Sequence, residues 1–532
     1  MVNGPNAGYL MATFRRQEHR CSSVALIIRI AVSKSRHHWL VGRFPRNMGK
    51  AQLKLMKRLI LFLLTLFIVF HINAQTAPVR RAAHVILITI DGLRPDMYLD
   101  SPNNPNGGWP TLNLRYLMRQ GTYAMHLKSV FPAYTYPSHT AMVTGALPAR
   151  SGIYFNQAKI RNGEWDWFST SIRVPTIWKV LKANGLTTAA VQWPLSGMDA
   201  ITYSVPEIFD IHHPDDRITL TRHYATPGLI DELERNATGV LDSSTLSDNY
   251  LSVDDNSARM AGYIFRTKRP AFLAMHLVSV DDHEHQQGRD GDSVRFALAS
   301  NDHDIGLMLE AIERSGVKDS TVIIVLGDHG FSDIHEAFRP NILIQDIGAK
   351  FIAAGGSAFL YPTPVVDAWP PDDSNRIDKH RQRRLQEIAD QVTAILNKLP
   401  EDKRKLFRIV DRKELDKMGA DSAAILALAA TPGLVFSGAV KPASVVNNGP
   451  GTQIQQNPLE GVFYPVHGGH HGYDPNIPEM YTGFIAAGVG IQKGGHITEL
   501  CETDIAPLVY ALLGIDFKTP DGKLIPGILV NQ

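Results

Sequence analysis

Cysteine is almost absent from this chain: Cys21 and Cys501 are the only two among 532 residues. Two cysteines supply no disulfide framework, so cysteine usage does not reveal the redox compartment. An excess of one charge is also missing, since 54 basic and 52 acidic residues leave a net charge of +2. This balance gives no electrostatic reason to expect nucleic acid or an anionic membrane surface as a partner. The hydrophobic fraction of 44% is ordinary for a globular protein.

No apolar stretch has the roughly 20 residues that a membrane-spanning helix needs. The run 59–70 follows basic residues between 54 and 58 and ends shortly before Ala74. This order is typical of a secretory signal peptide, so we expect cleavage near Ala74 and a periplasmic or secreted protein. An uncleaved signal anchor is the alternative. No cysteine follows the run for lipid attachment, so we expect no stable membrane anchor. Met56 is a more natural start for such a signal than Met1.

From residue 82 onward, short apolar runs alternate with amphipathic stretches. Strand-like runs cover 84–90, 187–192, 271–278, 321–326 and 483–488, and helical periodicity covers 112–118, 140–147, 177–183, 296–312 and 505–513. This alternation predicts a layered α/β domain with a largely parallel central sheet.

The alternation breaks between about 340 and 465, where a charged helix at 378–397 precedes a loop rich in Gly and Asn. We interpret this segment as an insertion packed on the core, and its basic residues as a solvated helix face, not a nucleic-acid site. The predicted organisation is therefore an N-terminal extension with a signal peptide at 1–77, and one catalytic domain at 78–532 that contains the insertion.

Acidic residues and histidines follow the ends of several apolar runs. In open α/β sheets, ligands bind beyond the carboxyl ends of the strands, so we expect these residues to share one site. If the chain around Asp281 is helical, His285 lies one turn away on the same face. The candidate ligands are Asp91, Asp281, His285, Asp328, His329 and His471, and Thr135 lies in a proline-framed turn between the first two motifs.

This set of side chains suits a pair of zinc ions with a hydroxyl nucleophile. Zinc accepts histidine nitrogen and carboxylate oxygen as ligands. Two Zn²⁺ ions carry four positive charges, and three aspartates with a threonine alkoxide balance them, so a phosphoryl anion meets little repulsion. Coordination also makes the alkoxide of Thr135 accessible near neutral pH. The expected chemistry is in-line displacement at phosphorus.

The order of the motifs resembles the nucleotide pyrophosphatase/phosphodiesterase family of the alkaline phosphatase superfamily. Residues 135–139, Thr-Tyr-Pro-Ser-His, are similar to the family's nucleophile segment Thr-Phe-Pro-Asn-His. Residues 152–156, Gly-Ile-Tyr-Phe-Asn, are similar to its Gly-Ile-x-x-Asn. The resemblance implies an alkaline-phosphatase-like α/β sandwich, with a mixed, mostly parallel central sheet and helices on both faces. It also implies that Thr135 is the nucleophile and that Asn156 helps to hold a phosphoryl oxygen.

The resemblance further implies two ligand sets and two substrate contacts. One zinc ion is bound by Asp281, His285 and His471, and the other by Asp91, Thr135, Asp328 and His329. Tyr136 keeps an aromatic ring where the family stacks a nucleobase. His276 stands where nucleotide-specific members have a second stacking tyrosine, so it is a candidate substrate-binding residue. The alternative for His276 is an inward-facing strand residue.

The predicted function is that of an exported two-zinc hydrolase, which cleaves phosphodiester or pyrophosphate bonds of nucleotides through a phosphothreonine intermediate. A phosphomonoesterase or phosphonate hydrolase is an alternative, although the Lys-x-Arg pair of threonine-type monoesterases is missing from the region shortly after Trp193 where it would be expected, which has only Asp215-Asp216-Arg217. A lipid head-group phosphodiesterase and an inactive binding protein are the others. A sulfatase needs a Cys or Ser nucleophile in place of Thr135. The leaving group and the oligomeric state stay open.

Overall fold

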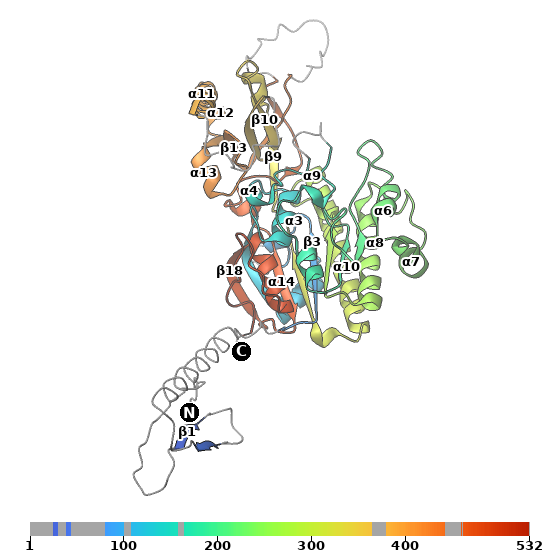
Figure 1. The fold of residues 1–532 in the computed structure, drawn as a ribbon. Helices are drawn as coiled ribbons and strands as arrows, with labels where there is room; N and C mark the ends of the chain where they lie inside the picture. The colour runs from blue at the N-terminus through green and yellow to red at the C-terminus, as the bar shows by residue number, and fades with distance from the viewer. Residues whose placement is uncertain are drawn as a thin grey trace. The chain divides into compact units, whose positions relative to one another are not determined.

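The computed structural model describes residues 25–29, 39–43, 80–99, 108–157, 164–363, 379–441, 459 and 461–530. Residues 1–77 and 78–532 form two separate compact units (Figure 1). In the first unit, β1 (Ala25–Arg29) pairs antiparallel with β2 (Trp39–Arg43). The expected signal segment lies outside the described residues. Among the described helices, none has the length and apolar character that crossing a membrane requires.

An eight-stranded sheet forms the centre of the second unit. Its order is β18 (Gly495–Cys501), β4 (Thr122–Lys128), β17 (Phe484–Gly488), β8 (Thr321–Leu326), β3 (His84–Ile90), β7 (Phe272–Leu277), β5 (Thr188–Val191) and β6 (Tyr203–Val205). Only the two pairings of β17 are antiparallel, so seven strands share one direction. The prediction of a mixed, mostly parallel sheet is confirmed.

Helices cover both faces of this sheet. Alternate residues of β3 point to opposite faces, and both faces carry apolar side chains that the helices bury. Ile86, Ile88 and Ile90 belong to one apolar cluster, and Val85 and Leu87 to the other. The first cluster includes side chains from α2 (Leu112–Gln120), α7 (Leu229–Leu233), α8 (Tyr250–Lys268) and α10 (Asp292–Arg314). The second includes side chains from α3 (Thr135–Thr144), α5 (Ile177–Ala183) and α14 (Ile505–Leu513). Figure 1 shows α8 and α10 on one side of β3 and α14 on the other.

Most predicted elements are confirmed, but one helix begins earlier than expected. The periodicity predicted a helix over 140–147, whereas α3 begins at Thr135. Pro137 is tolerated there because the first turn of a helix has no intrahelical partner for its N–H groups. This earlier start places Thr135, the predicted nucleophile, at the amino end of the helix.

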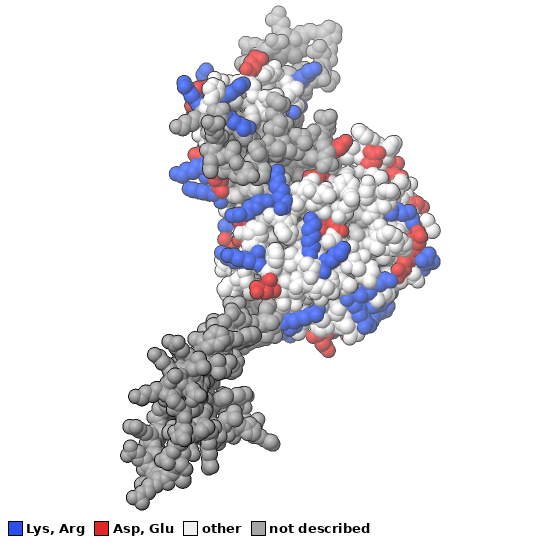
Figure 2. All heavy atoms as spheres, in the orientation of Figure 1, with Lys and Arg blue, Asp and Glu red and all other residues white. Residues whose placement is uncertain are grey.

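Smaller elements complete the second unit. The remaining helices of the main body are α4 (Pro148–Ser151), α6 (Ile218–Tyr224) and α9 (Ser279–Gln287). Short 3-10 helices are η1 (Pro95–Met97), η2 (Ser169–Ser171), η4 (Lys318–Ser320), η5 (Pro340–Leu343), η6 (Pro478–Met480) and η7 (Glu502–Asp504), and η3 (Glu234–Thr238) is a π turn. On the face drawn in Figure 2, basic and acidic side chains are interspersed over the second unit.

The segment between 340 and 465 builds one smaller sheet and contributes two strands to another. One is antiparallel, in the order β10 (Ala349–Ala354), β11 (Ser357–Pro362), β13 (Leu426–Ala430) and β12 (Phe407–Val410), with helices α11 (Lys379–Leu396), α12 (Glu401–Arg404) and α13 (Arg412–Lys417). The other consists of β14 (Gly433–Phe436), β9 (Ser332–Phe338) and β15 (Phe463–Pro465), with β16 (Gly469–His470) also paired to β9. The apolar cluster of this segment includes Ala133 and Tyr473, which flank the predicted site.

Candidate active site

The predicted ligands come together at the carboxyl edge of the central sheet. Asp91 directly follows β3, and Asp328 follows β8 after one glycine. Asp281 lies in α9, which begins two residues after β7. Because β7, β3 and β8 are neighbouring parallel strands, their carboxyl ends meet at the same edge. The sheet topology therefore brings together three aspartates that are far apart in sequence.

The first group of potential ligands contains Asp91, Asp328 and His329, whose ligand atoms lie within 4.8 Å of one another. The Nε2 atom of His329 is 3.2 Å from Oδ1 of Asp91 and 3.4 Å from Oδ2 of Asp328. The hydroxyl oxygen of Thr135 lies 3.4 Å from the same nitrogen. The four predicted members of this set are thus adjacent.

The second group lies beside the first. The two carboxylate oxygens of Asp281 are 3.5 Å from Nε2 of His285 and 3.6 Å from Nε2 of His471. The rings of His329 and His471 stack with their centroids 3.7 Å apart, so the two groups share a border. Because α9 is helical, Asp281 and His285 lie one turn apart on one face, as the spacing predicted.

Hydrogen bonds fix the tautomers of two of these histidines. Nδ1 of His285 donates to the carbonyl of Gly469 at 3.0 Å, and Nδ1 of His471 donates to that of Ala133 at 3.2 Å. A carbonyl oxygen only accepts, so in the neutral rings the lone pair is on Nε2, the atom that faces Asp281. Metal-binding histidines usually donate their other nitrogen in this way. The arrangement fits metal ligands.

The electrostatics of the group also favour cations. Burial raises the pKa of Asp91 well above its ordinary value, and repulsion from Asp328 adds to this shift. Burial raises the pKa of Asp328 to about 7, and it lowers the pKa of His329 well below its ordinary value. Within the described residues, Oδ1 of Asp91, Oδ1 of Asp281 and Oδ2 of Asp328 are buried without a hydrogen-bond partner. Unpaired buried carboxylates are costly, so this donor set fits divalent metal ions.

Thr135 is the first residue of α3 and is 8% exposed. Oδ1 of Asn156 accepts the backbone N–H of Tyr136 at 3.0 Å, which orients the side-chain amide next to the predicted nucleophile, Thr135. The amide nitrogen of Asn156 has no partner among the described residues, so it is free to donate to a ligand. Backbone N–H groups at a helix amino end also favour anions.

Tyr136 and His276 lie at the site but are 1% exposed. The ring of Tyr136 packs against Trp165 and Trp167, and its hydroxyl donates to Glu207 at 3.2 Å. Their expected role in binding a nucleobase stays a prediction, and in this conformation both rings are buried. The physical reason is that aromatic side chains from 165–167 cover the tyrosine, while the strand position of His276 points its ring inward.

Three histidines beside the site have contacts that sequence reasoning missed. Nε2 of His276 is 3.2 Å from Oδ2 of Asp91, and the ring of His139 packs against that of His276 with a centroid distance of 4.4 Å. His470 is grouped with His285 and His471 as a potential ligand. However, Nδ1 of His470 accepts the N–H of His471 at 3.0 Å, so its neutral ring carries the proton on Nε2. The Gly-His-His-Gly pattern at 469–472 was the sequence signal that could have pointed to His470.

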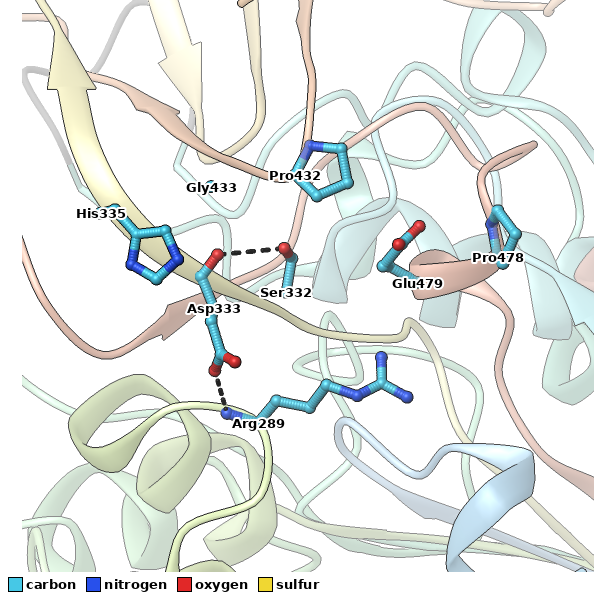
Figure 3. Close-up of a pocket in the computed structure, with 8 residues that line it drawn as sticks. All are labelled: Arg289, Ser332, Asp333, His335, Pro432, Gly433, Pro478 and Glu479. Atoms are coloured by element: carbon cyan, nitrogen blue, oxygen red, sulfur yellow. Dashed lines mark hydrogen bonds between the residues drawn. The ribbon is translucent and has the colours of Figure 1, made fainter. Parts of the chain in front are cut away.

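A separate cavity of about 410 Å³ borders the first part of β9 (Figure 3). Its lining includes Arg289, Ser332, Asp333, His335, Pro432, Gly433, Pro478 and Glu479. None of the predicted site residues lines it. The candidate reacting groups therefore lie at the edge of the central sheet, and not in this cavity.

The fold and the clustered aspartates and histidines define a protein with an alkaline-phosphatase-like α/β sandwich and a site suited to metal ions. The chain belongs to the type I phosphodiesterase / nucleotide pyrophosphatase family, whose sequence profile matches residues 85–474. This confirms the resemblance inferred from the motifs.

Individual relatives are similar over part of their length. Ectonucleotide pyrophosphatase/phosphodiesterase family member 3 of Mus musculus is 25% identical over 260 residues, which are 46% of this chain and 24% of the relative. Venom phosphodiesterase 2 of Crotalus adamanteus is 25% identical over 47% of this chain and 27% of its own length. The chain thus spans about a quarter of the length of these curated relatives.

Solved structures share the fold. Human ectonucleotide pyrophosphatase / phosphodiesterase 5 superposes with a TM-score of 0.57 at 17% identity, and the match covers 83% of this chain and 97% of that one. The murine protein of the same name, as an inactive threonine-to-alanine variant in complex with AMP, gives a TM-score of 0.55 over 84% of this chain and 97% of that one, also at 17% identity. These matches confirm the architecture that the motifs predicted.

Proposed function

We propose that this chain is an exported two-zinc hydrolase, which cleaves phosphodiester or pyrophosphate bonds of nucleotides through a phosphothreonine intermediate. The observation that carries the proposal is the convergence, near the hydroxyl of Thr135, of histidine ligand atoms and buried aspartate oxygens that have no hydrogen-bond partner among the described residues. Membership of the family supports the reaction class. The signal-like run at 59–70 and relatives named as venom phosphodiesterases support export.

We assign the ligands to two metal positions. Asp281, His285 and His471 hold one zinc ion, and Asp91, Thr135, Asp328 and His329 hold the other. When bound, the two ions would lower the pKa of the threonine hydroxyl and withdraw charge from the attacking and leaving oxygens. The lone pairs on Nε2 of His285 and His471 support the assignment.

Thr135 performs the first displacement. Its Oγ bonds to phosphorus, the bond from phosphorus to the leaving oxygen breaks, and the leaving alcohol or nucleotide takes up a proton. Water then attacks the phosphothreonine, which releases Thr135 and the phosphate product. Asn156 donates its free amide N–H to a non-bridging oxygen, and the amino end of α3 adds its field. These donors act where charge develops in the transition state.

The charge of the site favours diesters over monoesters. Two zinc ions with three aspartates and an alkoxide make a nearly neutral centre, which suits a singly charged diester. A monoester brings a second negative charge, and the region shortly after Trp193, where the Lys-x-Arg pair is expected, has only Asp215-Asp216-Arg217. A nucleotide substrate is supported by the murine protein with the same fold, whose structure is a complex with AMP.

The decisive experiment compares three substrates with the purified full chain. We expect kcat/KM for the p-nitrophenyl ester of thymidine monophosphate to exceed that for p-nitrophenyl phosphate at least tenfold. Bis-p-nitrophenyl phosphate is the control, because it is a diester without a nucleoside. Faster cleavage of the monoester would contradict the diesterase assignment.

A second candidate is a diesterase whose leaving group is a lipid head group or a simple alcohol. The burial of Tyr136 and His276 favours it, because neither ring is open to a base. Equal kcat/KM values for the nucleoside diester and for bis-p-nitrophenyl phosphate would support this candidate over the nucleotide one.

A further inference from the structure

Arg94 is a buried cation three residues after Asp91. Its side chain is 1% exposed, and its guanidinium pairs with Glu284, with Asp290 at 2.8 Å and with Asp96 at 3.2 Å. Exposed ion pairs contribute little to stability, but a buried guanidinium held by three carboxylates constrains the geometry of every segment that it contacts. Here one of those segments carries metal ligands.

Glu284 is the carboxylate that matters most in this contact. It is fully buried in α9, directly before His285 and one turn after Asp281. One of its oxygens binds Arg94, and the other has no partner in the part of the chain that the structure describes. This second oxygen faces Gly92, at which any side chain would collide with it. The carboxylate of this α9 residue thus packs directly against the turn that carries Asp91.

Arg289 extends the network to the third ligand-bearing segment. Its guanidinium donates to the carbonyl of Phe331 at 3.0 Å, two residues after His329, and pairs with Asp96 at 3.2 Å. Its backbone N–H donates to Asp333 at 2.8 Å, as Figure 3 shows. The strand end after β3, helix α9 and the loop after β8 are therefore joined by two arginines and their carboxylates.

We propose that Arg94 is a positioning residue, which acts with Glu284 to hold the two metal-binding groups at a fixed spacing. The inference rests on the proposed metal-dependent function. Asp91 comes from a strand end, whereas Asp281 and His285 come from a helix, so relative motion of these elements changes the separation of the two groups. The Arg94–Glu284 contact resists that motion because it joins the elements within one turn of the ligands on both sides.

The test measures the affinity of the protein for zinc and not the rate of turnover. Full-length protein is compared as wild type, Glu284→Gln and the double variant Arg94→Met/Glu284→Gln, by chelator competition with Zn²⁺ at a temperature at which each protein is folded. Loss of an outer partner of metal ligands typically weakens metal affinity about 10–100-fold. We expect a loss of this size for both zinc ions together, whereas Asp281→Ala is expected to lose one ion.

The double variant separates positioning from folding. Removal of one partner leaves a buried charge and destabilises a protein, but removal of both is often neutral for stability. We expect the double variant to recover thermal stability while its zinc affinity stays low. Recovery of wild-type zinc affinity along with stability would overturn the proposal, because the pair would then serve the fold alone.

Arg339 provides a matched control. It is 9% exposed, lies over the ring of Tyr464 at 3.8 Å and donates to the carbonyl of Gly461. Arg339→Lys is expected to leave zinc affinity unchanged, and an equal loss in this variant would also overturn the proposal. A wild-type chain that binds no zinc would instead refute the proposed function, and this outcome is visible before any variants are compared.

Discussion

The two halves of the proposed metal site differ in how far their side chains are exposed to solvent. The side chains of Asp91, Asp328 and His329 are 0–3% exposed. In the other half, His285 is 33% exposed and Asp281 is 13% exposed, whereas His471 is 4% exposed. The buried half comes from the ends of β3 and β8 and from the first turn of α3, which carries Thr135, whereas the open half comes from α9 and a loop. The comparison teaches that Thr135, the proposed nucleophile, lies with the more buried group of ligands, while His285 is the ligand most open to solvent.

The largest expected effect comes from Thr135→Ala in the buried half. Loss of the attacking oxygen is expected to lower kcat by several orders of magnitude, because water is poorly placed to replace it. Zinc content is expected to remain near two per chain. Thr135→Ser, which keeps a hydroxyl, is the control. An alanine variant with more than a tenth of the wild-type rate and two metals bound would refute the assignment.

The two halves can be separated by removing one ligand from each. Asp328→Ala and Asp281→Ala are each expected to reduce zinc content to about one per chain, because each removes one of a few ligands to its ion. The Asp328 variant is expected to lose more activity, since its half includes the nucleophile. Elemental analysis with rate measurements checks both. Unchanged metal content in both variants would show that the motifs do not form a metal site.

A smaller effect is expected for His470→Ala at the open half. The neutral ring carries its proton on Nε2, since Nδ1 accepts the N–H of His471, so it lacks the lone pair that a ligand needs there. Zinc content is expected to stay at the wild-type value, with a loss in kcat/KM of less than about tenfold, the effect of one hydrogen bond. A fall to one zinc per chain would show that His470 is itself a ligand.

The smallest effect concerns a buried carboxyl outside the metal site. Burial, with repulsion from Asp254, raises the pKa of Asp304 from 3.8 to about 8. Between these values the folded state binds more protons than the unfolded state, so stability is expected to fall as the pH rises from about 4 to about 8. Asp304→Asn is expected to remove this dependence without a change in zinc content, as thermal denaturation across this pH range can test. An identical pH profile in both proteins would contradict the raised pKa.

The central strands could be predicted because they are buried on both faces. A strand of this kind is a continuous apolar run, and the runs at 84–90 and 321–326 have the same bounds as β3 and β8. By contrast, β4 and β18 were missed. Both alternate buried with exposed or half-buried residues, and polar side chains such as Glu499 interrupt them, so they lack the continuous apolar signal.

The sequence by itself determined which atoms are available for chemistry: the carboxylates, imidazoles and threonine hydroxyl follow from residue type, and their order along the chain identified the family. Tertiary structure alone decided which of these atoms face one another. Tyr136 is covered by Trp165 and Trp167, and Arg94 meets Glu284 across 190 residues. Such contacts depend on how helices and loops pack against the sheet, and that packing is a non-local property without a local sequence pattern.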